Sequence, residues 1–137
     1  DGILDFWEKN SKEFNVVNYS TTLVQLGRIN RASKRNDPRL ERLLYEIDGH
    51  MSKSTELWGD REVSNILHAL AKLSLETGGS KALCNTILDE KIIKTVSRSH
   101  DPQSISNAIY ACAKLGTCCQ FLFDDAEDQA DWIVQNG

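Results

Sequence analysis

The sequence has few residues that interrupt helices: two prolines and eight glycines among 137 residues, a length that fits one domain. This scarcity allows long uninterrupted helices. No apolar run approaches the roughly 18–20 residues of a membrane-spanning helix, and no charged segment followed by an apolar one opens the chain, as in a secretory signal. We therefore expect no membrane insertion. Because the first residue is Asp1 and not Met, we expect a piece of a longer protein.

Cysteine and histidine are too scattered for a metal site. None of the four cysteines forms a C-x-x-C pair, and the three histidines lie far apart in the chain, whereas zinc ligands recur at short, defined spacings. Cys84 and Cys112 lie in apolar periodic stretches, where free cysteine packs as a small hydrophobe. Cys118 and Cys119 are adjacent and cannot readily bridge each other. We predict reduced, structural cysteines in a reducing compartment.

Signatures of catalysis are missing as well. The sequence contains no glycine-rich phosphate loop, no H-E-x-x-H motif and no nucleophile elbow. We therefore predict that the chain is not an enzyme, with no catalytic residue, no cofactor and no small-molecule substrate.

The charge is mild in total and uneven along the chain. The net charge is −4; residues 1–58 balance nine bases against nine acids, and residues 59–137 hold seven bases against eleven acids. Residues 28–42 include six bases, which either follow RNA phosphates or form a solvated loop. Residues 124–131 hold five acids and no base, so this segment would repel RNA and could instead solvate the chain or bind a basic protein.

An internal repeat is the strongest pattern in the sequence. Residues 64–73 read SNILHALAKL and residues 106–115 read SNAIYACAKL, with six of ten positions identical at an offset of 42. A weaker copy, STTLVQLGRI, occupies residues 20–29 at an offset of 44 from the middle copy. This spacing suits HEAT- or armadillo-like units of about 40–47 residues and is too long for tetratricopeptide or ankyrin units.

Each copy, and the segment after it, has apolar residues at helical spacing, which predicts a pair of helices per repeat. In the middle copy they are Val63, Ile66, Leu67, Leu70 and Leu73; in the next segment they are Leu83, Ile87, Leu88, Ile92 and Val96. One helical hairpin cannot bury its apolar face alone, so neighbouring hairpins must stack. The predicted fold is all-α, a right-handed α-solenoid of about three helix-hairpin repeats with seven helices and no sheet. Its single domain, residues 1–137, contains repeats at 17–58, 59–99 and 100–137, and residues 1–16 end a preceding repeat.

Capping residues and small residues support these helices. The expected starts are Asp37-Pro38, Asp60, Gly79-Ser80 and Asp101-Pro102, and Gly116 is the expected end of the last copy. A final helix is expected from about residue 119 to residue 134. Small side chains should allow close helix approach at Ala69, Ala71, Ala111 and Ala113, and the three tryptophans, Trp7, Trp58 and Trp132, are expected in packing.

The pattern SNILHALAKL, together with SNAIYACAKLG after Asp101-Pro102-Gln103, resembles the octotricopeptide-type repeat and its FAST-kinase-like and heptatricopeptide relatives. The opening ILDFWEKNSKEFNVVNYSTTLVQLGRI, followed by DPRLERLL, resembles the entry region of such arrays. These proteins often carry a RAP domain. The resemblance implies a role in RNA processing, stability or translation in a chloroplast or mitochondrion.

Matching positions of the three copies supply candidate RNA contacts on the face opposite the apolar stripe. They are Thr21, Val24 and Arg28; Asn65, His68 and Lys72; and Asn107, Tyr110 and Lys114. An amide can bind a base edge, a ring can stack on a base and a cation can bind phosphate, one base per repeat. With the basic run, the candidate RNA-binding set is Arg28, Arg31, Arg35, Asn65, His68, Lys72, Asn107, Tyr110 and Lys114.

Structural roles would produce the same periodicity. The lysines could complement helix dipoles, the asparagines could bond loop backbone between repeats, and the rings could cover a neighbouring hairpin. Helical arrays also bind proteins. A protein-docking scaffold or an accessory subunit of an organellar complex is therefore the alternative to single-stranded RNA as the partner.

Overall fold

The computed structural model describes residues 2–29 and 37–116, and the regular secondary structure of this part of the chain is all helical, with no strand. The prediction of an all-α fold with seven α-helices is confirmed. The α-helices are α1 (Gly2–Asn10), α2 (Val16–Ile29), α4 (Pro38–Lys53), α5 (Asp60–Leu73), α6 (Gly78–Ile87), α7 (Glu90–Ser97) and α8 (Pro102–Leu115), and the 3-10 helices are η1 (Ser11–Glu13) and η2 (Thr55–Leu57).

Two of these seven helices, α6 and α7, occupy the place of one expected helix. The predicted continuous helix over residues 79–96 is wrong, because the chain breaks into α6 and α7 at Leu88 and Asp89. The Asp89 side chain accepts a hydrogen bond from the Lys91 N–H, which caps α7 and stabilises the break. The helix expected over residues 119–134 lies outside the described residues.

Capping residues set most helix boundaries as expected. Asp37 and Asp101 accept a hydrogen bond from the backbone two residues ahead, and each is followed by proline. Gly116 ends α8 in the left-handed conformation, with φ 71°. Asp60 was expected to be the N-cap of its helix, and this is wrong. Gly59 occupies the N-cap position, and Asp60 is the first residue of α5.

The start of α6 also differs from the expected one. Its cap is Thr77, which lies before the predicted Gly79-Ser80 start. The Thr77 side chain accepts a hydrogen bond from the Ser80 N–H, at 3.3 Å, so a threonine hydroxyl takes the place assigned to glycine and serine.

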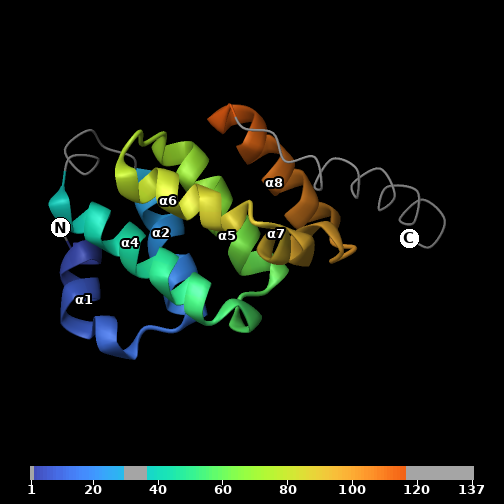
Figure 1. The fold of residues 1–137 in the computed structure, drawn as a ribbon. Helices are drawn as coiled ribbons and strands as arrows, with labels where there is room; N and C mark the ends of the chain where they lie inside the picture. Colours follow the sequence, from blue (N-terminus) through green and yellow to red (C-terminus); the bar gives the residue numbers. More distant parts are fainter. Residues whose placement is uncertain (1, 30–36, 117–137) are drawn as a thin grey trace.

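Helices of successive repeats lie side by side in two rows. The first row consists of α2, α5 and α8, with α5 packed between the other two, and in the second row α4 packs on α6 (Figure 1). Both α6 and α7 also contact α5, which joins the rows. This pairing of like helices is what a stacked array requires. The right-handed solenoid itself remains a prediction.

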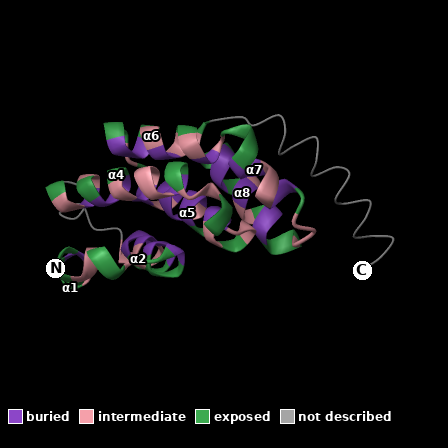
Figure 2. Ribbon diagram, turned by 60° about the horizontal axis from the view of Figure 1, so that its bottom comes forward, coloured by how far each residue is buried: buried purple, intermediate pink, exposed green. Residues whose placement is uncertain are grey.

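The core lies between the rows, and Figure 2 shows the buried faces of the helices turned toward one another. All five residues of the apolar stripe of α5 are buried. The apolar residues of α4 are buried as well, namely Leu40, Leu43, Leu44, Ile47 and Met51. The first row is closely packed where α2 crosses α5: a Cβ at Gly27 would lie 3.6 Å from Ala69. Ala71 and Ala111 are buried too, but Ala113 is exposed, so its predicted packing role is wrong.

Two of the tryptophans are buried as expected, Trp7 and Trp58, while Trp132 lies outside the described residues. Their indole N–H groups donate to Glu46 Oε2 at 2.8 Å and to His50 Nδ1 at 3.0 Å. Cys84 and Cys112 form no disulfide bond within the described residues. Burial raises the pKa of Cys84 above its usual value, although a hydrogen bond with Ser80 opposes this effect. Cys118 and Cys119 fall outside the described residues.

Candidate nucleic-acid interface

Each helix of the first row keeps one exposed or partly exposed stripe, and the candidate residues lie on these stripes. Helical spacing of three or four residues places the members of one stripe on one face. The stripes are Thr21, Val24 and Arg28 on α2; Arg61, Asn65, His68 and Lys72 on α5; and Gln103, Asn107, Tyr110 and Lys114 on α8. The α5 and α8 stripes adjoin, because His68 contacts Tyr110 and both asparagines line one hollow. Together with the stripe of α2, which packs on the other side of α5, they are called here the stripe surface.

The residues of the three stripes include cations and no carboxylate, and Asp101 borders them beside Arg61. Helices α2 and α8 contain no acidic residue, and the acids of α5, Asp60 and Glu62, lie in its first turn. Arg28, Lys72 and Lys114 occupy the last turns of the three helices. These positions also complement the helix dipoles, so the dipole interpretation and phosphate binding are compatible.

The rings predicted on separate repeats contact each other. The imidazole of His68 and the phenol of Tyr110 have centroids 5.7 Å apart, with planes inclined by 37°. Tyr110 remains 54% exposed, whereas His68 is half-buried. The pair therefore presents mainly the tyrosine ring to solvent.

Two lysines approach His68 from different helices. Burial lowers the pKa of His68 below its usual value, and the positive charges of Lys72 and Lys114 lower the pKa further. The imidazole is therefore neutral at pH 7. Lys72 of α5 and Lys114 of α8 therefore both lie close enough to His68 to act on its charge.

The two asparagines border one hollow. Asn65 and Asn107 line a depression of about 280 Å³ with Arg61, Asp101, Gln103 and Ser104. The Gln103 side-chain amide donates to Asn107 Oδ1 at 3.2 Å. The hollow thus presents several amide groups beside an Arg61–Asp101 ion pair, in which N and O lie 3.8 Å apart.

A serine, not an asparagine, bonds backbone across the repeats. The buried Ser64 hydroxyl donates to the Ser104 carbonyl at 2.9 Å. Ser104 Oγ in turn lies 3.1 Å from Asp60 Oδ2 and 3.0 Å from Asp101 Oδ2. Sequence reasoning missed this cluster, although Ser64 is one of the identical repeat positions and could have been read as a contact between repeats.

The three described bases of the basic run of residues 28–42 lie in different places. Arg28 is exposed at the end of α2, while Arg31 and Arg35 lie outside the described residues. Arg39 pairs with Asp37, Asp5 and Glu8, and Arg42 pairs with Glu8 at 2.7 Å. Arg39 and Arg42 therefore attach α4 to α1 and do not belong to the stripe surface. The acidic segment 124–131 also lies outside the described residues.

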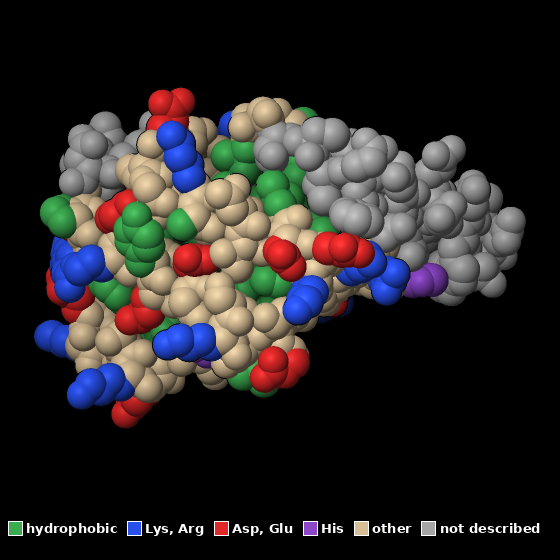
Figure 3. Space-filling model, viewed as in Figure 1, with side chains coloured by type: hydrophobic (Ala, Val, Ile, Leu, Met, Phe, Trp, Pro, Cys, Tyr) green, Lys and Arg blue, Asp and Glu red, His purple; other side chains and the backbone are tan. Residues whose placement is uncertain are grey.

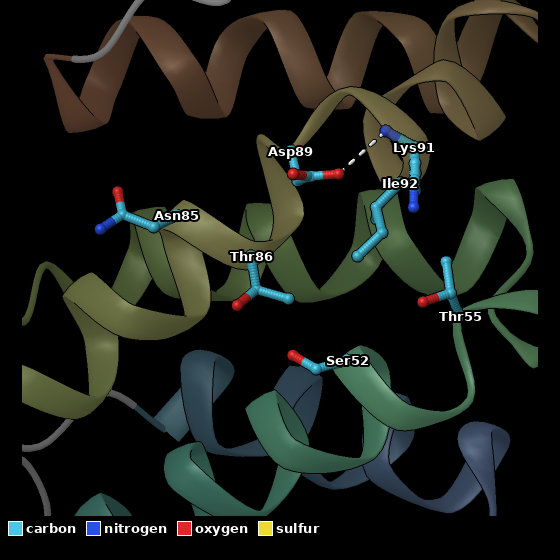
Figure 4. Close-up of a pocket in the computed structure, with 7 residues that line it drawn as sticks. All are labelled: Ser52, Thr55, Asn85, Thr86, Asp89, Lys91 and Ile92. Carbon is cyan, nitrogen blue, oxygen red and sulfur yellow. Dashed lines mark hydrogen bonds between the residues drawn. The ribbon is translucent and has the colours of Figure 1, made fainter.

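The second row presents a different surface. Lysine, arginine and acidic side chains alternate over the face that includes α4, α6 and α7 (Figure 3). A hollow of about 390 Å³ opens there, lined by Ser52, Thr55, Asn85, Thr86, Asp89, Lys91 and Ile92 (Figure 4). It offers one cation and no ring, and Thr86 donates a hydrogen bond to the nearby Asp48. This hollow lacks the combination of groups found on the stripe surface.

Within residues 2–29 and 37–116, no group of three potential metal-ligating side chains is present, and no helix is long and apolar enough to span a membrane. Comparisons with known protein families, curated proteins and solved structures gave no match.

Proposed function

We propose that the chain is a single-stranded RNA-binding helical-repeat module, with RNA lying across the stripe surface of α2, α5 and α8. The observation that carries this proposal is the matched arrangement of groups on neighbouring helices. Cations occupy the last turn of each helix, amides and rings precede them on α5 and α8, and no carboxylate interrupts the stripes. Cations bind phosphates, and an exposed ring stacks on a base whatever its sequence.

The charges of the second row make it the weaker candidate for RNA. Arg39, Arg42 and Lys94 are engaged in ion pairs with acidic side chains. Phosphate binding there would have to compete with carboxylates that already neutralise these cations.

The repeat resemblance extends the proposal to cellular role. Proteins of the octotricopeptide, FAST-kinase-like and heptatricopeptide type act on RNA in organelles. A chain with the SNILHALAKL pattern would accordingly belong to an RNA processing, stability or translation factor of a chloroplast or mitochondrion.

A protein-docking scaffold is the second candidate, and the α1–α2 end of the chain favours it. Phe6 is 60% exposed and Val17 is 59% exposed. Phe6 also lines a mainly apolar hollow of about 350 Å³ between α1 and α2. Exposed apolar groups beside a hollow are typical of protein contacts. An accessory subunit of an organellar complex would use this end.

A salt-dependent titration with mixed-sequence single-stranded RNA tests the RNA proposal. The decisive variant replaces Arg28, Lys72 and Lys114 with glutamine. Its control replaces Lys53, Lys81 and Lys91, which are exposed on the second row, so that both variants lose three positive charges. Because each lost phosphate contact reduces the slope of log K against log salt by about 0.7, the first variant should bind more weakly with a slope shallower by about 2.

The control should retain the affinity and the slope of the original chain. Equal weakening of both variants would show that net charge, not the stripe surface, governs binding. If the original chain binds no RNA even at low salt, the RNA proposal is wrong and the docking scaffold becomes the better explanation.

A further inference from the structure

The contact between α5 and α8 combines the chemical groups that one nucleotide needs. Resting on the proposed RNA-binding function, we propose that the seam between these helices is a single nucleotide-binding subsite. Tyr110 is its stacking platform and His68 positions that ring. Asn65 and Asn107 face the edge of the base, and Lys72 and Lys114 bind its phosphate.

The ring geometry supports one platform shared by two repeats. A reader with one base per repeat would need the His68 ring and the Tyr110 ring to be separately accessible. Instead the two rings lie against each other at 5.7 Å, and Tyr110 keeps 54% of its surface exposed. A base can stack on the exposed face of Tyr110 while His68 restricts the motion of that ring, which lowers the entropy cost of binding.

Amide, ring and lysine occur in the same order on both helices of the seam. Asn107 precedes Tyr110 by three residues and Lys114 follows it by four; Asn65, His68 and Lys72 repeat this order on α5. Seven residues of helix correspond to about 10 Å along the axis. Both asparagines line one hollow, and both lysines act on the His68 imidazole. The two helices therefore bring each kind of group together with its counterpart.

The neighbouring seam between α2 and α5 lacks these groups on one side. At the matching positions α2 carries Thr21, Val24 and Arg28, which provide a cation without an amide or a ring. Phosphate binding can continue there, but a base has no exposed tyrosine on which to stack. We therefore expect base stacking at the α5–α8 seam and only backbone contacts at the α2–α5 seam.

The test uses the full chain and a single-stranded RNA that contains the fluorescent base 2-aminopurine. Stacking on Tyr110 should quench the fluorescence upon binding. Tyr110→Ala should weaken binding roughly 5- to 150-fold, which corresponds to the loss of one base–ring stack, and should abolish the quenching. Tyr110→Phe should retain both properties. Tyr45→Ala is the matched control, because Tyr45 is 51% exposed on α4 of the second row.

His68 requires a separate test because it acts through Tyr110. His68→Ala should weaken binding and reduce the quenching, while His68→Phe, which retains a ring against Tyr110, should restore the quenching. A histidine that served only the fold would change stability without changing the 2-aminopurine signal. Circular dichroism establishes that each variant is folded, and Tyr110→Leu, which keeps apolar bulk against His68, replaces Tyr110→Ala if the alanine variant unfolds.

The failure of this subsite is distinguishable from the failure of RNA binding. If the original chain binds RNA and Tyr110→Ala or Tyr110→Leu leaves affinity and quenching unchanged, the subsite is wrong and the RNA-binding proposal stands. If the original chain does not bind RNA, both proposals are overturned.

Discussion

The backbone N–H of Gly79, at the start of α6, donates a hydrogen bond to the carboxylate of Glu41 on α4. The carboxylate therefore lies at the positive end of the α6 dipole and joins the two helices of the second row. Gly79 is buried, so few other acceptors can reach its N–H. This hydrogen bond joins two residues 38 positions apart in the sequence.

Replacing that carboxylate should destabilise the fold. Glu41→Ala removes a charge-assisted hydrogen bond and leaves a buried N–H unpaired, which costs about 1–3 kcal/mol. Urea unfolding followed by circular dichroism measures the change in the free energy of unfolding. Glu56→Ala, at an exposed position of η2, is the control and should change it by less than about 0.5 kcal/mol. Equal effects of the two substitutions would contradict the assigned role of Glu41.

The matched serines of the repeat should differ sharply in their effect on stability. Ser64 is 1% exposed and donates to the Ser104 carbonyl, whereas Ser106, its counterpart in the next copy, is exposed. Ser64→Ala should lower the free energy of unfolding by about 1 kcal/mol, and Ser106→Ala should leave it within about 0.5 kcal/mol. Denaturant unfolding of the two variants makes the comparison. A larger loss for Ser106→Ala would contradict the packing of α5 against α8.

Glu46 should be a sensitive position because one of its oxygens accepts two hydrogen bonds. Trp7 Nε1 and the Tyr19 hydroxyl both donate to Glu46 Oε2, each at 2.8 Å. Glu46→Ala would leave both buried donors unpaired, at a cost of about 2–4 kcal/mol, while Glu46→Gln retains an acceptor oxygen and should cost less. Thermal and urea unfolding distinguish the two variants. Equal losses would show that the carboxylate charge, and not the acceptor, is needed.

Acid should destabilise the fold partly through His68. Burial, followed by the charges of Lys72 and Lys114, holds the native pKa of His68 below its usual value, while the unfolded value is about 6.5. As the pH falls through the unfolded pKa, the unfolded chain takes up a proton that the native chain does not. The free energy of unfolding should therefore decrease, and the decrease should end below the native pKa.

Removing the imidazole should remove this part of the pH dependence. The difference in the free energy of unfolding between the original chain and His68→Gln, measured by urea unfolding from pH 8 to pH 5, should shift in favour of the variant as the pH falls. A difference that does not vary with pH would contradict the lowered pKa. Comparing the two chains cancels the contributions of the titratable groups that they share.

RNA binding should tighten as the pH falls, if phosphate binds beside His68. Lys72, Lys114 and Tyr110 are the titratable groups that the structure places against this imidazole, and the two lysines oppose its protonation. A bound phosphate would offset these positive charges and raise the pKa of His68, so binding would take up a proton. Titrations at pH 8, 7 and 6 measure this effect, and His68→Phe should bind with less pH dependence than the original chain. If the RNA affinity of both chains depends equally on pH, the phosphate does not bind beside His68.

Helix positions were predictable where periodicity and capping residues agreed. The Asp101-Pro102 start, the Gly116 end and the buried stripe of α5 all follow from local preferences that do not require a partner helix. The break between α6 and α7 was not predicted, because Leu83, Ile87 and Ile92 continue an apolar pattern across it. Periodicity alone cannot distinguish one continuous helix from two consecutive helices that bury their apolar residues in the same core. Asp89, followed by Glu90, was the available signal for a new start.

The sequence by itself determined which face of each repeat's first helix is buried, because a period of 3.6 residues separates the apolar stripe from the partly exposed stripe that carries Asn65, His68 and Lys72. It did not determine which groups meet. That Tyr110 lies on His68, and that Ser64 bonds to Ser104, depends on the axial shift and the rotation of α8 relative to α5. The buried side chains between the two helices set this shift and rotation, and their packing exists only in the tertiary structure.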